Sequence, residues 1–292
     1  MKCLLIKNAD VYAPQPLGIV DLLIINDKIA KIGQQLAAPQ GLDCQILDAQ
    51  KRKVVPGYVD QHVHIIGGGG ESGPYSRTPE INLSELTKVG ITTVVGVLGT
   101  DGTSRHNESL LAIVRETEIP ARHFIPTHVN RASHLFEQAK EFARLGGYVD
   151  ITSGIREQDG FPACVKPSDA IKILYEEGVP MDKVTMSSDA NGCMSVTLPD
   201  GSQKQLAVSP DSFQEEVKDA LLAGVPTDVV AKVVSSNPAQ ANGLYPQKGC
   251  LQPDSDADLI IYSDTYDIDT VIAKGQIMVA AGEALVKGTF EK

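Results

Sequence analysis

The sequence feature that most constrains this chain is a pair of histidines, His62 and His64, at the end of a β-branched run. Residues 53–66 are predicted to form a strand, and residues i and i+2 of a strand point to the same face. Two imidazoles would then project side by side from one strand end, which suits a divalent metal such as zinc. A run of glycines begins at Gly67, and glycine lets the backbone turn sharply beside a ligand.

The middle of the chain, about residues 53–245, alternates helix-like segments with β-branched strands. The order helix, glycine, strand occurs around Gly90, Gly146 and Gly178, and glycine supplies the left-handed residue that ends many helices. This alternation predicts βα units and a parallel sheet, in which chemistry gathers at the carboxyl ends of the strands. The residues that follow such predicted strands are His62, His64, Thr100, His128 and Asp189.

The predicted strands of the middle region are too few for a closed barrel. Strand ends are expected near residues 66, 98, 128, 152 and 188, which makes five. A (β/α) barrel has eight strands and about 250 residues, and one helix, 109–118, is all that fits between the second and third strands. The sequence therefore predicts an α/β protein with an incomplete (β/α) barrel of the TIM type.

Both ends of the chain have the pattern of short strands. Near the amino terminus, Asn26-Asp27 separates two apolar runs, which is typical of a β-hairpin. Neither end has enough apolar residues for a core of its own, so we expect 1–52 and 246–292 to build one small β-sandwich domain together. The barrel domain would then comprise 53–245. The segments expected as strands are 3–7, 20–32, 44–48, 258–262, 268–273, 276–280 and 283–287.

Five stretches of the sequence carry a resemblance to a known family. Val54 to His64 resembles the first-strand signature of the amidohydrolase superfamily, Pro-Gly-φ-φ-Asp-x-His-x-His with φ apolar. The continuation Ile-Ile-Gly-Gly-Gly-Gly-Glu-Ser-Gly-Pro at 65–74 is similar to the isoaspartyl (β-aspartyl) dipeptidases, as are residues 96–101, 126–131 and 187–192. The resemblance runs from end to end except for the family's third, fourth and fifth barrel strands. These have no counterpart, and the join falls near 111–114.

The resemblance implies a metal site and its ligands. His62 and His64 match ligands of the family's first metal, and His128 matches a ligand of the second. Asp189 matches the last-strand aspartate, which ligates the first metal and shuttles the proton. The family binds two Zn²⁺ ions, bridged by a carboxylated lysine and assisted by a further histidine. Both of those residues belong to the strands that are lost here, so at most one zinc is well supported.

The resemblance also implies a substrate site. Gly69, Glu71, Thr100 and Arg131 match substrate-binding positions, with Glu71 facing the α-ammonium group and Arg131 a carboxylate. A guanidinium group suits bidentate contact with a carboxylate. The implied activity is hydrolysis of small β-aspartyl dipeptides by a zinc metallohydrolase, expected to be a homo-oligomer.

The composition of the chain restricts its binding partners and its cellular compartment. The net charge is −11 and no basic run occurs, which argues against nucleic acid or a membrane surface as a partner. The five cysteines are odd in number and none has C-x-x-C spacing. We therefore expect no disulfide framework and a reducing, cytoplasmic location. The amino terminus has too short an apolar run for a signal peptide, and no run approaches the roughly 20 apolar residues of a membrane span.

Two alternatives remain open. The chain could be another amidohydrolase that opens cyclic amides, as hydantoinases and dihydroorotases do, although the glycine-rich run at 67–74 argues against this. It could also be a truncated relative with impaired catalysis, because five strands leave open sheet edges that invite aggregation.

Overall fold

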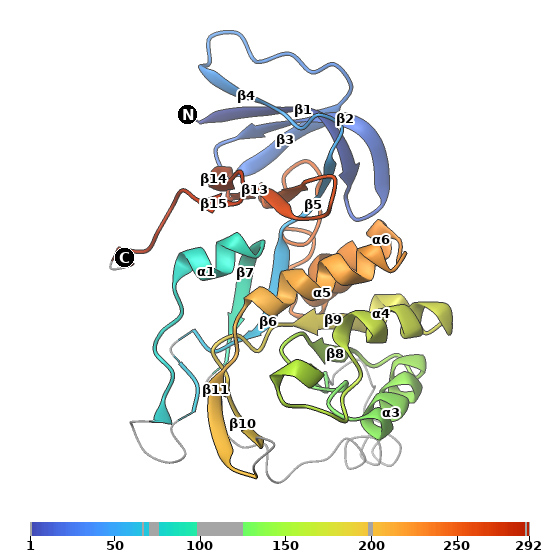
Figure 1. Cartoon of the computed structure of the whole chain (residues 1–292). Coiled ribbons are helices and arrows are strands. Elements are labelled where there is room, and N and C mark those ends of the chain that lie inside the picture. Colours follow the sequence, from blue (N-terminus) through green and yellow to red (C-terminus); the bar gives the residue numbers. More distant parts are fainter. Residues whose placement is uncertain are drawn as a thin grey trace. The chain divides into compact units, whose positions relative to one another are not determined.

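A computed structural model describes residues 2–65, 67–69, 76–97, 125–197, 201–289 and 291 of the chain. The chain divides into two compact units, which are coloured by sequence in Figure 1 and are treated separately below. Unit 1 comprises Met1–Val59, Asn82–Val94 and Pro226–Lys292, and unit 2 comprises Asp60–Ile81 and Val95–Val225.

Unit 1 contains one nine-stranded sheet to which both ends of the chain contribute (Figure 1). Its order is β15-β14-β13-β12-β5-β1-β2-β3, with β4 paired to β1. β5 joins the two ends because it pairs antiparallel with β12 and parallel with β1. The prediction that strands from both ends combine is thereby confirmed. The strands are β1 (Cys3–Tyr12), β2 (Pro16–Ile25), β3 (Lys28–Gly33), β4 (Cys44–Asp48), β5 (Lys53–Pro56), β12 (Leu259–Tyr262), β13 (Ile268–Ala273), β14 (Gln276–Ala280) and β15 (Glu283–Ala284).

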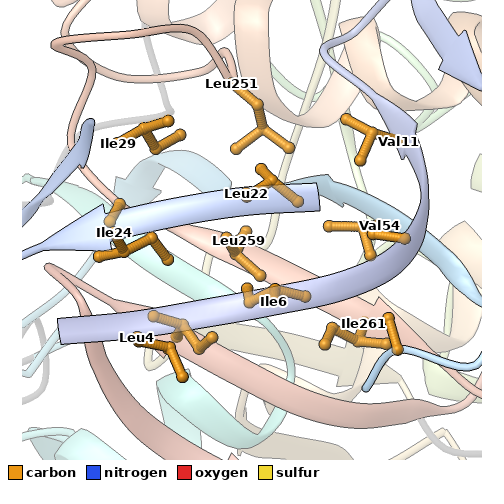
Figure 2. Close-up of a cluster of buried hydrophobic side chains, with 14 residues drawn as sticks. Leu4, Ile6, Val11, Leu22, Ile24, Ile29, Val54, Leu251, Leu259 and Ile261 are labelled. Carbon is orange, nitrogen blue, oxygen red and sulfur yellow. The ribbon is translucent and has the colours of Figure 1, made fainter. Parts of the chain in front are cut away.

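Apolar side chains of these strands form the core of unit 1 (Figure 2). Leu4 and Ile6 of β1 stand two residues apart, as do Leu22 and Ile24 of β2, and all four are buried. A spacing of two places side chains on one face of a strand. Burial of each such side chain contributes about 1.5–3 kcal/mol, so the alternating pattern stabilises the sheet that the chain ends share.

No disulfide framework was expected from the sequence, but the structure contains one disulfide among its described residues. Cys3 and Cys44 form a disulfide, and their Cα atoms are 4.5 Å apart. The parallel register of β1 and β4 places the two residues directly opposite each other. Linear spacing along the sequence carries no information about that register, which is why it did not reveal the pair.

The helices of unit 1 are short. At the start of α1 (Leu83–Lys88), the Asn82 N–H donates to Glu85 Oε2 at 2.8 Å, which satisfies one free donor of the helix terminus. Three further helical segments follow unit 2 in the sequence and were not predicted. They are α6 (Thr227–Ala231), a π-helical segment (Lys232–Ser236) and α7 (Asn237–Ala241).

The barrel strands form a partial, parallel arrangement. β6 (Tyr58–Val63) pairs with β7 (Ile91–Gly96), and both strands begin in unit 1 and end in unit 2. Within unit 2, Val63 bridges in parallel to Ala190, just beyond β9 (Val184–Ser187). β9 in turn pairs in parallel with β8 (Val149–Thr152). Among the described residues the order is therefore β7-β6-β9-β8, which is a partial (β/α) barrel as predicted.

Three expectations about these strands need refinement. The predicted strand 53–66 is two strands, β5 and β6, interrupted at Gly57. A Cβ at Gly57 would lie 2.2 Å from Thr92 Oγ1, so the chains approach closely there. Residues 125–128 are not a regular strand, but the Asp150 N–H donates to Pro126 O and extends the pairing beyond β8. The helix expected at 109–118 lies outside the described residues.

Helices cover the strands of unit 2 in the predicted alternation (Figure 1). α3 (Ser133–Arg144) and α4 (Pro167–Glu176) both contact β8, and α4 contacts α5 (Asp211–Leu222). Gly146 and Gly178 follow α3 and α4 with φ of 90° and 66°, the left-handed conformation that the sequence predicted there. The remaining elements are 3₁₀ turns at Glu157–Asp159 and Met181–Lys183 and the hairpin β10 (Cys193–Thr197) and β11 (Gln203–Ala207).

None of the helices in the described part of the chain combines the length and the apolar character that a membrane crossing requires.

Substitution of Gly90 by alanine tests how tightly unit 1 is packed. Gly90 has φ of 82°, and a Cβ there would lie 2.6 Å from Ile260 Cδ1 and 2.8 Å from Tyr58 Cε2. Gly243, in the same unit, has φ of 69° and nothing within 4 Å. Both Gly90→Ala and Gly243→Ala should lose about 1–2 kcal/mol through the left-handed backbone, and Gly90→Ala should lose about 1–3 kcal/mol more through overpacking. Urea denaturation measures the difference, and equal losses would contradict the packing described here.

Candidate metal centre

Three side chains from two segments that are distant in the sequence converge in unit 2. His64 Nε2 lies 3.1 Å from Asp189 Oδ1, and His62 Nε2 lies 3.4 Å from the same oxygen. One ligand atom from each of the three residues falls within 4.8 Å of the others. Only 9 % of the His64 side chain and 8 % of the Asp189 side chain are exposed. The convergence that the sequence predicted therefore occurs at the carboxyl ends of β6 and β9.

Backbone pairing produces this convergence. The His64 N–H donates to Ala190 O at 2.9 Å, next to the parallel bridge between Val63 and Ala190. Asp189 has φ of 56°, so the backbone turns sharply directly after β9. A left-handed conformation at an aspartate is tolerated because its short side chain hydrogen-bonds locally. The turn brings the carboxylate back toward the two imidazoles.

His128 lies beside this cluster. Its Nε2 is 4.0 Å from Asp189 Oδ2, and its ring centroid is 5.3 Å from that of His62. On the other side of the ring, Nδ1 lies 2.8 Å from Thr152 Oγ1 at the end of β8. Burial lowers the pKa of His128 to about 4. The imidazole is therefore neutral near pH 7, the form that coordinates a metal.

Opposing effects act on the Asp189 carboxyl. Burial raises its pKa, but the hydrogen bond to His64 and the neighbouring imidazoles lower it by more, so the pKa lies below its ordinary value. Asp189 is consequently a carboxylate near neutral pH. An ionised carboxylate with two hydrogen-bonding oxygens is suited both to ligate a cation and to accept a proton.

A second carboxyl group, Asp60, lies behind the histidines. It is fully buried, and its Oδ1 accepts hydrogen bonds from the backbone N–H groups of His62 and Ser188, both at 3.1 Å. Burial raises the pKa of Asp60 to about 7. These two bonds link the strand that carries His62 to the residue before Asp189. Asp60 is part of the Pro-Gly-φ-φ-Asp-x-His-x-His signature, but sequence reasoning gave it no role.

The predicted substrate residues fall into two groups. Gly69 has φ of 74°, and a Cβ there would lie 2.5 Å from Ser76 O and 2.9 Å from Cys193 Cβ, so the glycine loop is closely packed. Arg131 is exposed, and its guanidinium carbon lies 5.6 Å from the centroid of the Phe161 ring. The other two residues, Glu71 and Thr100, lie outside the described residues.

The donor set fits a divalent metal. Two imidazoles and a carboxylate provide three protein ligands, the number that catalytic zinc sites use while they keep a fourth position for water. Nδ1 of His64 is buried and has no hydrogen-bond partner among the described residues. No described neighbour therefore engages that nitrogen. His62, His64 and Asp189 could hold one ion, with His128 close enough to assist.

The fold and this cluster define a barrel-type α/β protein with a candidate metal site at the carboxyl ends of its strands. The model of the Amidohydrolase family matches residues 106–278, which is more than half of the chain. The chain belongs to the amidohydrolase family.

Solved structures refine the likeness within the family. The β-aspartyl dipeptidase of Fervidobacterium islandicum AW-1, solved in complex with β-Asp-Leu dipeptide, is 27 % identical, has a TM-score of 0.84 and matches over 99 % of each chain. The predicted resemblance to β-aspartyl dipeptidases is thereby confirmed. Dihydropyrimidinase from Brevibacillus agri NCHU1002 is 14 % identical, with a TM-score of 0.68 over 97 % of this chain and 96 % of that one. At that identity the likeness concerns the fold.

Curated relatives match over shorter stretches. Dihydroorotase of Staphylococcus aureus (strain MRSA252) is 38 % identical over 90 residues, which are 31 % of this chain and 20 % of that protein. Dihydroorotase of Bacillus cytotoxicus is 27 % identical over 143 residues, or 48 % of this chain and 32 % of that protein. The matched region thus spans a third or less of these relatives' length.

Replacement of Asp189 tests the metal centre without any substrate. Asp189→Asn keeps the shape of the side chain but removes the charge, and we expect the affinity for Zn²⁺ to fall by more than the roughly 10- to 100-fold that loss of a supporting partner costs. Asp182→Asn, at a side chain that is 64 % exposed, is the matched control. Competition with a chromophoric chelator measures both affinities. Equal affinities in the two variants would show that Asp189 is not a ligand.

Proposed function

We propose that this chain hydrolyses the isopeptide bond of small β-aspartyl (isoaspartyl) dipeptides in a metal-dependent reaction. The observation that carries the proposal is the convergence of His62, His64 and Asp189, with His128 beside them. It occurs in a chain that matches a β-aspartyl dipeptidase over 99 % of its length.

The metal and three side chains, His62, His64 and Asp189, would each contribute to the reaction. When bound, a divalent ion such as zinc would lower the pKa of a water molecule to about 7 and polarise the scissile carbonyl. His62 and His64 would hold the ion through neutral ring nitrogens. Asp189 would also accept the proton of the attacking water and deliver it to the leaving amine, which is general base followed by general acid catalysis. The small exposed fraction of Asp189 favours such a transfer because little bulk water competes for the proton.

The substrate would be held by groups of both signs. A β-aspartyl dipeptide carries one ammonium group and two carboxylates. Arg131 would bind a carboxylate and Glu71 the ammonium group, while Gly69 and Thr100 would contact the backbone of the substrate. Stacking of the Arg131 guanidinium group on Phe161 supports this role, because it limits the orientations of that group before the substrate binds.

Further properties follow from the same assignment. We propose one zinc ion per chain, since the bridging lysine and the extra histidine of the two-metal relatives have no counterpart in the sequence. A homo-oligomeric state and a cytoplasmic location, both expected from the sequence, belong to this proposal too, although the disulfide between Cys3 and Cys44 removes the cysteine argument for that location.

A cyclic-amide hydrolase is the second candidate. The stretches that match dihydroorotases favour it. A truncated relative with impaired catalysis is the third, because the five barrel strands that the sequence predicts would leave the wall of the site open. Turnover of dihydroorotate or hydantoin without turnover of dipeptides would favour the second, and a metal-loaded protein without turnover of any of these would favour the third.

Hydrolysis of β-Asp-Leu tests the proposal directly. The zinc-loaded protein should release leucine from β-Asp-Leu and leave α-Asp-Leu intact. Charged groups positioned to bind the ends of an isopeptide would hold the peptide bond of α-Asp-Leu out of line with the attacking water. Removal of the metal with a chelator should abolish turnover, and added Zn²⁺ should restore it. Release of leucine is followed by chromatography. Turnover that persists after complete metal removal, or equal turnover of both dipeptides, would contradict the proposal.

Arg131→Met tests the carboxylate clamp. Loss of a charge-assisted hydrogen bond costs about 1.5–3 kcal/mol, so KM for β-Asp-Leu should rise roughly 10- to 150-fold while metal affinity stays unchanged. Arg144→Met is the control, because Arg144 is exposed at the end of α3 and forms only a 3.8 Å ion pair with Glu177. An unchanged KM in the Arg131 variant would remove Arg131 from the site.

A further inference from the structure

In unit 2, the carboxylate of Asp150 accepts hydrogen bonds from four side chains. Asp150 lies on β8, is 1 % exposed, and has no part in the chemistry above. Its Oδ1 accepts hydrogen bonds from Gln61 Nε2 at 2.9 Å and from Thr185 Oγ1 at 2.8 Å. Its Oδ2 accepts from Thr127 Oγ1 at 2.8 Å and from Ser187 Oγ at 2.5 Å.

These four bonds satisfy the carboxylate completely. An ionised carboxylate has about four acceptor sites. Each of them is used here by a side chain from outside β8. A buried charge without partners would be expensive, whereas hydrogen bonds to an ionised acceptor are short and roughly twice as strong as neutral ones. The four donors come from β6, from β9 and from the segment before His128.

The donors are neighbours of the metal-centre residues. Gln61 precedes His62, and Thr127 precedes His128. Ser187 is two residues before Asp189, on the same strand end. Each segment that brings a side chain to the metal centre is thus tied to Asp150 within two residues of that side chain. Since β8, β9 and the 125–130 segment are hydrogen-bonded side by side, one residue reaches them all.

We propose that Asp150 is a positioning residue that sets the spacing of His62, His128 and Asp189 by binding their three segments to one carboxylate. In a closed barrel, a continuous ring of strands holds the ligands in place. The described strands form an open arc, and Asp150 takes over part of that task through its hydrogen bonds to three segments. The inference rests on the proposed metal-dependent function and adds the residue that aligns its ligands.

Two substitutions test this role. Asp150→Asn replaces one acceptor oxygen by an amide donor, so two of the four hydrogen bonds are lost. Thr127→Val removes one donor, next to His128, and keeps the side-chain shape, so it serves if the first variant folds poorly. Asp182→Asn, at an exposed side chain, is the matched control for the loss of a carboxylate.

Two measurements distinguish positioning from a merely structural role. Loss of a supporting partner lowers metal affinity about 10- to 100-fold, so we expect that loss for Asp150→Asn, with kcat reduced and KM for β-Asp-Leu nearly unchanged. The second measurement needs no metal. Imidazole ¹⁵N resonances of His62 and His128 in the metal-free protein should shift in Asp150→Asn, and that of His128 in Thr127→Val, while the exposed His134 keeps its resonance.

The outcomes separate this inference from the proposed function. Zinc binding by the wild-type chain, with the same affinity and the same histidine resonances in both variants, would overturn the role of Asp150 and leave the proposed function standing. Absence of zinc binding by the wild-type chain would overturn the proposed function. In that case the resonances alone decide: shifts at His62 and His128 support the positioning role, and unchanged resonances refute it.

Discussion

The parallel alignment of the end of β6 with the residues after β9 is the constraint on which the site depends. The hydrogen bond from the His64 N–H to Ala190 O brings two histidines and a carboxylate together although 125 residues separate His64 from Asp189. Side chains on neighbouring parallel strand ends project from the same edge, so correct pairing aligns them without further adjustment. A shift of one residue would point both imidazoles away from Asp189.

Three buried carboxyl groups surround this alignment and differ in their partners. Asp189 faces imidazoles and is ionised, which suits ligation. Asp60 accepts backbone N–H groups from the segments of both histidines and Asp189. Asp150 accepts side-chain donors only. Buried polar groups are tolerated when they are fully hydrogen-bonded, and here the same bonds that satisfy the carboxyl groups hold the strand ends together.

Local patterns in the sequence predicted many of the strands and helices and the residues that converge, but not α6, the π-helical segment or α7. Gly90, Gly146 and Gly178 marked helix ends because only a residue without Cβ enters the left-handed region at little cost. The histidine pair marked a strand end through its spacing. The partnership of Cys3 with Cys44 and the role of Asp150 escaped prediction, because both depend on which strands become neighbours. The only local signal for Asp150 was a charged residue within the apolar strand 149–152, and such residues are rarely buried without partners.

By itself, the sequence determined the strands of the chain ends, several of the βα units, the membership in the amidohydrolase family, and which imidazoles and carboxylate were expected to converge. These properties follow from residue type and short-range spacing. Only the tertiary structure decided that His128 stands beside His62, that Asp60 and Asp150 tie the strand ends together, and that a cysteine pair joins β1 to β4. Such relations arise from strand register between distant segments, and register is set by packing and hydrogen bonding in the folded chain rather than by any local pattern.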